Sequence, residues 1–189
     1  MDVQTWLNSV NGQTVDMDGA YGGQCWDLWS SYARNVYNIP AADTNTVDGY
    51  AASVYSARYD RSQALQNTFS RESANYTPTY GDVAFWNGNG MNHVAIVVRD
   101  NGDGTLNTMS QNPNKAGYVT LSKNGIIGYF HPRTANTPAP APADNTVTII
   151  PRTYKVNVDT LNVRSAPSVN AEVVAQYHYG QPSIWPKAV

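Results

Sequence analysis

The spacing of apolar residues changes from a helical period to a strand-like alternation near Gly81, and this order restricts the folds that the chain can adopt. In the first segment, residues at positions i, i+3, i+4 and i+7 form one helical face, made of Val3, Trp6, Leu7 and Val10. A second helix is predicted to begin at Cys25, with an apolar face made of Leu28, Trp29, Tyr32, Ala33 and Val36. Pro40 ends this helix, and residues 41–79 are predicted to form short helices and loops.

Short runs rich in β-forming side chains follow Gly81 and alternate with turn sequences. The runs cover residues 82–86, 93–98, 105–109, 118–121 and 126–130. Turn sequences such as NGNG, DNGDG and KNG lie between them. Helices followed by an antiparallel meander predict an α+β fold.

The sequence TPAPAPAD at residues 137–144 is rich in Pro and Ala and predicts an extended, semi-rigid spacer. We therefore expect a first domain at residues 1–133, a Pro/Ala-rich linker at 134–151 and a small β segment at 152–189. The last segment is short for an independent core, because domains of below about 40 residues usually need additional stabilisation. We expect it to be a truncated module.

The charge and hydropathy of the chain exclude two classes of partner. The formal net charge is −2 at pH 7 without a basic footprint, so nucleic acid is not an expected partner. No apolar run approaches the roughly 18 residues of a membrane span, so we expect no membrane insertion. The sequence MDVQTWLNSVNGQ lacks the basic and apolar regions of a signal peptide, so we expect export by another route. We expect the chain to act as a monomer.

The chain contains one cysteine, Cys25, which cannot form an internal disulfide or a cysteine-rich zinc site. A lone cysteine is often a small buried apolar residue, and that interpretation stays open. Its position at the start of a predicted helix favours the thiolate, because the helix dipole and unpaired N–H groups stabilise negative charge. The glycines before it allow the close backbone approach that a substrate cleft requires. These features indicate a candidate nucleophile.

A nucleophilic cysteine needs a base, and the chain offers three histidines. His178 lies beyond the linker, and His131 ends the last predicted strand, which favours a structural role. His93 begins a strongly apolar strand and is the candidate base, although an ordinary histidine at a strand entrance fits its position equally well. A base is oriented by a group on its other ring nitrogen. The next strand is followed by polar residues that either fill this role or form a turn, namely Ser110, Gln111 and Asn112.

Three sequence blocks occur in the order found in one known family. They are GGQCWDLWSSYAR (22–34), PTYGDVAFWNGNGMNHVAIVV (78–98) and SQN (110–112). Over residues 3–132 the chain resembles the CHAP family of cysteine/histidine-dependent amidohydrolases and peptidases. The resemblance implies a papain-like fold, with a cysteine at the head of a helix that packs on an antiparallel sheet. It also implies cleavage of amide bonds in bacterial peptidoglycan, with Cys25 as nucleophile and His93 as general base.

The resemblance also implies which residues orient the base and stabilise the oxyanion. The third catalytic residue of the family is a Glu, Asp or Asn shortly after the histidine strand, and similar calcium-binding phage lysins have a Glu and an Asn two residues apart there. This chain has Ser110 and Asn112 at these positions, so the Glu is missing. The resemblance therefore implies that Asn112 orients His93, with Ser110 as the alternate. Gln24 and the backbone N–H of Cys25 are the expected oxyanion-hole donors.

Three aspartates surround the cysteine in a Gly-rich stretch. Aspartate is also common in turns and in the first turn of helices, so ordinary structural roles stay open. Calcium binds about six to eight oxygens from carboxylates and carbonyls, and the stretch offers both without matching the full EF-hand pattern. Similar staphylococcal phage lysins bind calcium in this loop. The resemblance implies Ca²⁺ ligation by Asp16, Asp18 and Asp27, with the carbonyls of Ala20 and Gly22.

The segment at 161–181, which begins LNVRSAP, resembles the start of a bacterial SH3-type (SH3b) wall-binding domain. The whole layout implies a phage endolysin, which stays in the host cytoplasm until holin-mediated release and then acts at the bacterial cell wall. Its expected partner is peptidoglycan, cleaved as an endopeptidase or as an N-acetylmuramoyl-L-alanine amidase. The alternatives are a non-catalytic wall-binding protein, a secreted bacterial autolysin and a general papain-type protease.

Overall fold

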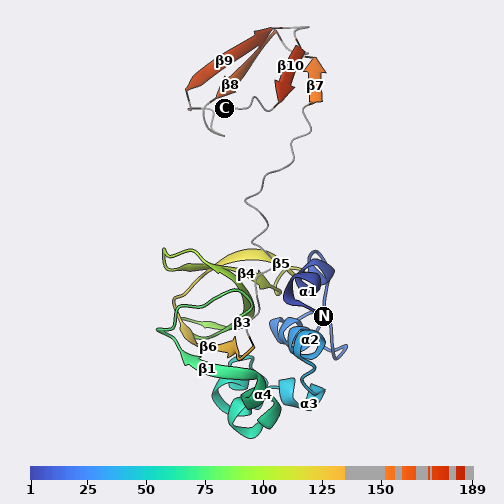
Figure 1. The fold of residues 1–189 in the computed structure, drawn as a ribbon, viewed down its shortest axis with the longest axis vertical. Coiled ribbons are helices and arrows are strands. Elements are labelled where there is room, and N and C mark those ends of the chain that lie inside the picture. Colours follow the sequence, from blue (N-terminus) through green and yellow to red (C-terminus); the bar gives the residue numbers. More distant parts are fainter. Residues whose placement is uncertain (135–151, 156–158, 165–169, 171, 179–181, 186–189) are drawn as a thin grey trace. The chain divides into compact units, whose positions relative to one another are not determined.

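The structure is a computed structural model, and it describes residues 1–134, 152–155, 159–164, 170, 172–178 and 182–185. The chain divides into two compact units, Met1–Pro140 and Ala141–Val189 (Figure 1). Most of the predicted linker, at 135–151, lies outside the described residues. The last three residues of the LNVRSAP sequence also lie outside them.

Short helices form the N-terminal half of the first unit. They are α1 (Val3–Val10), α2 (Cys25–Tyr37), α3 (Ala41–Thr44), the π-helical turn η1 (Val54–Arg58), the 3₁₀ turn η2 (Tyr59–Arg61) and α4 (Gln63–Thr68). Asp2 caps α1, because its Oδ1 atom accepts a hydrogen bond from the N–H of Thr5 at 2.8 Å. α2 ends before Asn38, whose φ of 57° is left-handed, and Pro40 follows. Both α1 and α2 lie where the apolar spacing predicts them.

A six-stranded antiparallel sheet forms the rest of the first unit. Its strands are β1 (Phe69–Ser73), β2 (Val83–Gly88), β3 (Met91–Asp100), β4 (Thr105–Ser110), β5 (Gly117–Ser122) and β6 (Ile126–Pro132). Their order across the sheet is β1-β6-β2-β3-β4-β5, so β1 and β5 are the edges. The predicted runs correspond to β2 through β6, whereas β1 lies in the segment that was predicted to hold helices and loops. β1 buries Phe69 alone, so no apolar alternation marks it in the sequence.

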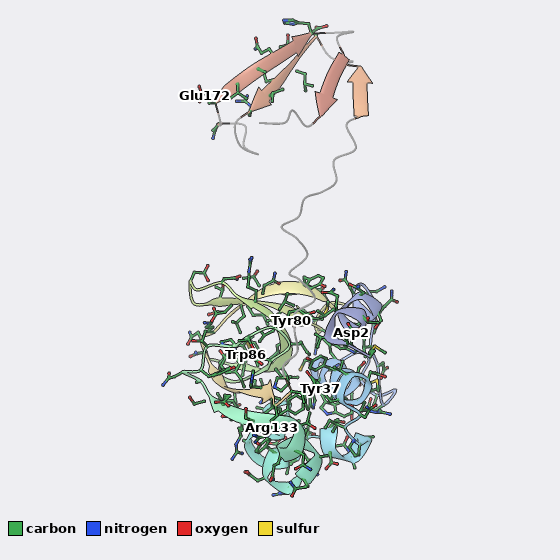
Figure 2. The ribbon with its side chains drawn as sticks, viewed as in Figure 1. Asp2, Tyr37, Tyr80, Trp86, Arg133 and Glu172 are labelled. Carbon is green, nitrogen blue, oxygen red and sulfur yellow. The ribbon has the colours of Figure 1, made fainter. Side chains whose placement is uncertain are left out.

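The sheet separates two apolar clusters, because alternate residues of each strand point to opposite faces. On the helix side, Trp29 of α2 is fully buried, and its ring centroid lies 5.8 to 6.0 Å from those of Phe69, Phe85 and Phe130. The opposite face carries a second cluster, made of Ala84, Trp86, Ala95, Val97, Leu106, Ile126 and Tyr129. Figure 2 shows Trp86 among the strands of the sheet. The aromatic packing around Trp29 fixes α2 against the sheet.

The described residues of the second unit form short strands. β7 (Arg152–Lys155) pairs with β10 (Pro182–Trp185), and β8 (Thr160–Arg164) pairs with β9 (Val173–His178), both in antiparallel fashion. β structure is what the sequence predicts for this segment. Across the described residues of both units, no helix combines the length and the apolar content that crossing a membrane requires.

Candidate active site

Cys25 is the first residue of α2, and it is 9% exposed. The helix begins there because Gln24 has an extended backbone and its N–H donates to the Oδ2 atom of Asp27 at 2.7 Å. Asp27 lies in the first turn of the helix, where negative charge is favoured. The local sequence thus places the thiol at the N-terminal end of the helix, as predicted.

Burial raises the pKa of the Cys25 thiol above its ordinary value. The backbone amides of Val94, Trp26 and Cys25 itself lower the pKa, but they do not cancel the effect of burial. The amides at the start of the helix thus favour the thiolate, as predicted, but desolvation outweighs them and favours the neutral thiol. The interaction with the Val94 amide also shows that the thiol lies close to the first half of β3. Val94 is the residue that follows His93 in the chain.

His93 pairs with Trp86 across β2 and β3, and their ring centroids are 5.8 Å apart. It is 8% exposed, and burial lowers its pKa to about 4, so the imidazole is neutral at pH 7. Its Nε2 atom lies 2.8 Å from the Oγ atom of Ser110 at the end of β4. Nδ1 of His93 forms no hydrogen bond with the described residues, which leaves this nitrogen for proton transfer.

Ser110, and not Asn112, contacts the imidazole of His93. β4 ends at Ser110, and the backbone turns at Asn112, which has a left-handed φ of 71°. The turn directs the Asn112 amide to Gln24, where Nδ2 donates to Oε1 at 2.8 Å. The expected contact between Asn112 and His93 is therefore not formed. Ser110, the alternate residue, contacts His93 instead. A hydroxyl can hold a ring nitrogen by a hydrogen bond without adding charge.

Gln24, the expected oxyanion-hole residue, lies between the acidic loop and the turn after β4. Its Nε2 atom donates to the carbonyl of Tyr21 at 2.9 Å, and its Oε1 atom accepts from Asn112. Because a side-chain amide carries two N–H donors, one donor of Gln24 forms no hydrogen bond with the described residues. The position of Gln24 is thus set by the segments on both sides of it.

A pocket of about 410 Å³ opens beside the base, and its lining includes His93, Ser110 and Asn112. A second pocket of about 290 Å³, lined in part by Tyr50, shares Asn92 with the first. The two pockets therefore lie next to each other at the start of β3. They give an extended ligand room on the histidine side of the site.

The carboxylates of Asp16, Asp18 and Asp27 converge, with one oxygen of each within 4.8 Å of the others. Asp27 is buried, whereas Asp16 and Asp18 are exposed. Burial raises the pKa of Asp27, as do the charges of Asp18 and Asp16, while the amides of Met17 and Gln24 lower it. None of the three forms an ion pair with a described residue, so their mutual repulsion is not offset by a side-chain cation.

The loop that carries these carboxylates suits a hard cation. The Oδ1 atom of Asp16 accepts from the N–H of Gly19 at 2.7 Å, and that of Asp18 accepts from the N–H of Ala20 at 2.8 Å. Gly22, with a left-handed φ of 68°, lies in the same loop. The converging groups are carboxylate oxygens, which fit Ca²⁺ better than zinc, since structural zinc sites use mainly sulfur and nitrogen.

His131 belongs to a different set of contacts within the first unit. Nδ1 of His131 is 2.8 Å from Oδ1 of Asp82 and 3.0 Å from the hydroxyl of Tyr76, which agrees with the structural role expected for it. His178 lies on β9 in the second unit.

Two features of the site were not predicted from the sequence. The Gln111 amide faces the acidic loop rather than His93, and it contacts Val15 across 96 positions of the chain. Asp27 caps α2 in addition to joining the carboxylate cluster, since its Oδ2 atom accepts from Gln24. A capping acid three residues after a polar residue is a signal that the sequence does carry. No comparable local pattern in the sequence predicts that Gln111 contacts Val15.

The CHAP domain family model matches residues 14–112, a span that contains Cys25, His93 and Ser110. This chain belongs to the CHAP domain family. A curated relative, the D-alanyl-L-alanine endopeptidase of Streptococcus phage B30, is 34% identical over 106 residues. That match covers 53% of this chain and 22% of the relative, so the chain spans about a fifth of the relative's length.

Solved structures share this fold. The wild-type endolysin LysIME-EF1 is similar with a TM-score of 0.54 at 24% identity, over 68% of this chain and 61% of that chain. Ly7917, solved with the hydrolyzing product of MDP, has a TM-score of 0.51 at 19% identity, over 95% of this chain and 78% of that chain. The α+β, papain-like fold class predicted from the sequence is confirmed.

Proposed function

We propose that this chain is a peptidoglycan hydrolase that cleaves an amide bond of the bacterial cell wall, with Cys25 as its nucleophile. The observation that carries the proposal is a buried thiol that interacts with the backbone amide of Val94, the residue after His93, together with a His93 imidazole that Ser110 holds through Nε2. A nucleophile, a neutral base and a group that orients the base are the parts that acyl transfer needs. The name of the phage B30 relative, a D-alanyl-L-alanine endopeptidase, supports the substrate class.

The reaction begins with the thiol and the imidazole both neutral, because burial disfavours their charged forms. Nδ1 of His93 takes the proton from Sγ of Cys25 as the sulfur attacks the carbonyl carbon of the substrate. The carbonyl oxygen becomes an oxyanion, which the backbone N–H of Cys25 and the Gln24 amide stabilise. The imidazolium gives its proton to the leaving amine as the C–N bond breaks. His93 then activates a water molecule that hydrolyses the thioester.

Endopeptidase cleavage within the wall peptide is the preferred reaction, because the relative with that name is 34% identical over 106 residues. Amidase cleavage next to muramic acid uses the same chemistry on a different amide bond. Mass spectrometry of the released fragments distinguishes the two by the new amino terminus.

The acidic loop is proposed to hold one Ca²⁺ ion through Asp16, Asp18 and Asp27, with the carbonyls of Ala20 and Gly22. Convergence of the three carboxylates within 4.8 Å supports this assignment. When bound, the ion would neutralise these carboxylates and restrict the loop before the nucleophile. The catalytic steps themselves use the side chains of the protein.

The second unit is proposed to be an SH3-type wall-binding segment. Its support is the LNVR sequence on β8, which pairs with β9 as a small antiparallel sheet. Such a segment would tether the hydrolase to its polymer and raise the effective concentration of substrate. We assign the whole chain to a phage endolysin that acts on the cell wall after its release from the host cytoplasm.

A non-catalytic wall-binding protein is the second candidate. The observation that favours it is the neutral hydroxyl of Ser110 where the resemblance implies a carboxylate beside the base. Purified Gram-positive cell walls, followed by loss of turbidity, distinguish the two candidates. We expect the wild-type chain to clear the walls and Cys25→Ala to leave them intact. Sedimentation with walls that are not cleared would support the binding protein, and equal clearing by both chains would exclude Cys25 as nucleophile.

A further inference from the structure

The side chain of Gln111 is 2% exposed, and its amide group is hydrogen-bonded to the backbone of two distant residues. Its Oε1 atom accepts from the N–H of Val15 at 2.7 Å. Its Nε2 atom donates to the carbonyl of Val15 at 2.7 Å and to the carbonyl of Gln24 at 2.9 Å. The amide therefore uses three of the roughly four hydrogen-bonding positions that it offers.

These bonds hold both ends of the acidic loop. Val15 immediately precedes the loop, and Gln24 is the residue before Cys25 in α2. The bonds span 96 and 87 positions of the chain, so nothing local in the sequence of the loop can replace them. Gln111 thus joins the entry and the exit of the loop to the end of β4.

Gly23 leaves the space that the Gln111 amide occupies. A Cβ atom at this position would lie 2.8 Å from Nε2 of Gln111 and 2.8 Å from the carbonyl oxygen of Val15. Real Cβ atoms do not approach other atoms so closely, and one of these partners is backbone. The close approach of Gln111 to the loop therefore depends on a glycine before the nucleophile.

The neighbours of Gln111 contact the remaining parts of the site. Ser110 lies 2.8 Å from Nε2 of His93, and Asn112 donates to Oε1 of Gln24 at 2.8 Å. Three consecutive side chains at the end of β4 therefore contact the base, the loop and the residue before the nucleophile. The segment that holds the imidazole is the same segment that holds the helix start.

From this geometry we propose that Gln111 is a positioning residue, which fixes the backbone of Gln24, and with it the Cys25 thiol, relative to the His93 imidazole. The inference rests on the proposed cysteine chemistry, in which this thiol and this imidazole exchange a proton. Misplacing reacting groups by about 1 Å can cost roughly 100-fold in rate. Gln111 acts through Cys25, and its effect falls on kcat more than on KM.

Few side chains can replace Gln111. Glutamate has the same shape, but it would set an oxygen against the carbonyls of Val15 and Gln24 and lose two hydrogen bonds. Asparagine keeps the amide but is one methylene shorter, so it cannot reach both carbonyls. Gln66→Glu is the matched control, because Nε2 of Gln66 also donates to a backbone carbonyl, that of Tyr59 at 2.9 Å, outside the site.

The test compares the full chain with its Gln111→Glu, Gln111→Asn and Gln66→Glu variants at a temperature where circular dichroism shows each of them folded. Two quantities are measured: kcat and KM on soluble wall peptides, and the rate at which iodoacetamide alkylates Cys25 near neutral pH. We expect both Gln111 variants to lower kcat by about tenfold or more with KM within about twofold. We expect alkylation to slow by at least about threefold, because the thiol loses its aligned base. Gln66→Glu should match the wild type.

Wild-type kcat and alkylation rate in the folded Gln111 variants would overturn the proposal. Loss of folded structure in both variants would overturn it as well, since Gln111 would then determine the fold rather than the site. The alkylation assay needs no peptidoglycan, so it separates this inference from the proposed function. A wild-type chain that leaves wall peptides intact, with slower alkylation in the Gln111 variants, would reject the function and keep the positioning role.

Discussion

The Nε2 atom of His93 lies 2.8 Å from the Oγ atom of Ser110, so a hydroxyl group sets the orientation of the imidazole. A hydroxyl lacks the charge with which a carboxylate stabilises an imidazolium. The proton affinity of this imidazole is therefore set mainly by burial, which lowers its pKa to about 4. The site depends on hydrogen bonds and desolvation more than on charge.

Ser110→Ala removes the hydrogen bond to His93 and leaves a buried ring nitrogen unpaired. We expect kcat to fall about 10- to 100-fold with KM little changed, since an unpaired buried polar group costs roughly 1–3 kcal/mol. Steady-state hydrolysis of soluble wall peptides measures this effect. Asn112→Ala is the matched control, because its amide contacts Gln24 and not the base. Wild-type kcat in the Ser110 variant would exclude Ser110 as the residue that orients His93.

The free energy of unfolding should depend on pH through His93. Its pKa is about 4 in the folded protein and 6.5 ordinarily, so between these values the unfolded chain binds a proton that the folded chain does not. This contribution to stability is complete above pH 6.5 and is lost as the pH falls towards 4, by up to about 3 kcal/mol. Guanidinium unfolding of the wild type and His93→Gln at pH 7.5 and 4.5 measures the difference. A difference that does not change with pH would contradict this prediction.

Removal of calcium should destabilise the first unit if the acidic loop holds the ion. Saturation to about 100 times Kd contributes roughly 2.7 kcal/mol, so we expect EGTA to lower Tm by about 5–10 °C. Differential scanning fluorimetry measures Tm, and calorimetry measures the heat of calcium binding. Asp16→Asn and Asp18→Asn together should abolish both responses, and magnesium should not replace calcium. An unchanged wild-type Tm with EGTA, together with no heat of binding, would remove calcium from the site.

Trp29→Ala should destabilise the first unit by about 3–5 kcal/mol, because its fully buried ring packs against three phenylalanines between α2 and the sheet. Chemical denaturation followed by circular dichroism measures the loss. Tyr118→Ala, at a 46% exposed position on β5, is the control and should change stability by no more than about 0.5 kcal/mol. Similar losses in the two variants would show that α2 does not depend on this aromatic cluster.

Elements with a local pattern could be predicted from the sequence. The apolar spacing after Cys25 and the position of Pro40 predict a helix that the structure shows as Cys25–Tyr37. The runs between residues 82 and 130 correspond to strands, because buried residues and turn sequences mark them. β1 could not be found in this way, since Phe69 is its one buried residue.

The sequence could limit the candidates for each contact in the site to a few residues, but it could not identify which residue makes the contact. The SQN sequence supplies three polar candidates near His93, yet only the structure shows that Ser110 reaches the ring and that Asn112, with its left-handed backbone, contacts Gln24 instead. The protonation state of Cys25 likewise follows from how deeply the thiol is buried, which a helix-start position does not reveal. Both quantities depend on segments that are far apart in the chain.

Asp27 serves two neighbours with one carboxylate group, since it accepts from Gln24 at the start of α2 and from Met17 in the acidic loop. For protein engineering, the three aspartates of the carboxylate cluster therefore differ in how freely they can be substituted. Asp16 and Asp18 accept hydrogen bonds from within their own loop, so their ion preference can be redesigned locally. Any substitution of Asp27 also changes the hydrogen bonding in the first turn of the helix that carries Cys25. The ion preference of the loop therefore cannot be altered at Asp27 without affecting the position of the thiol.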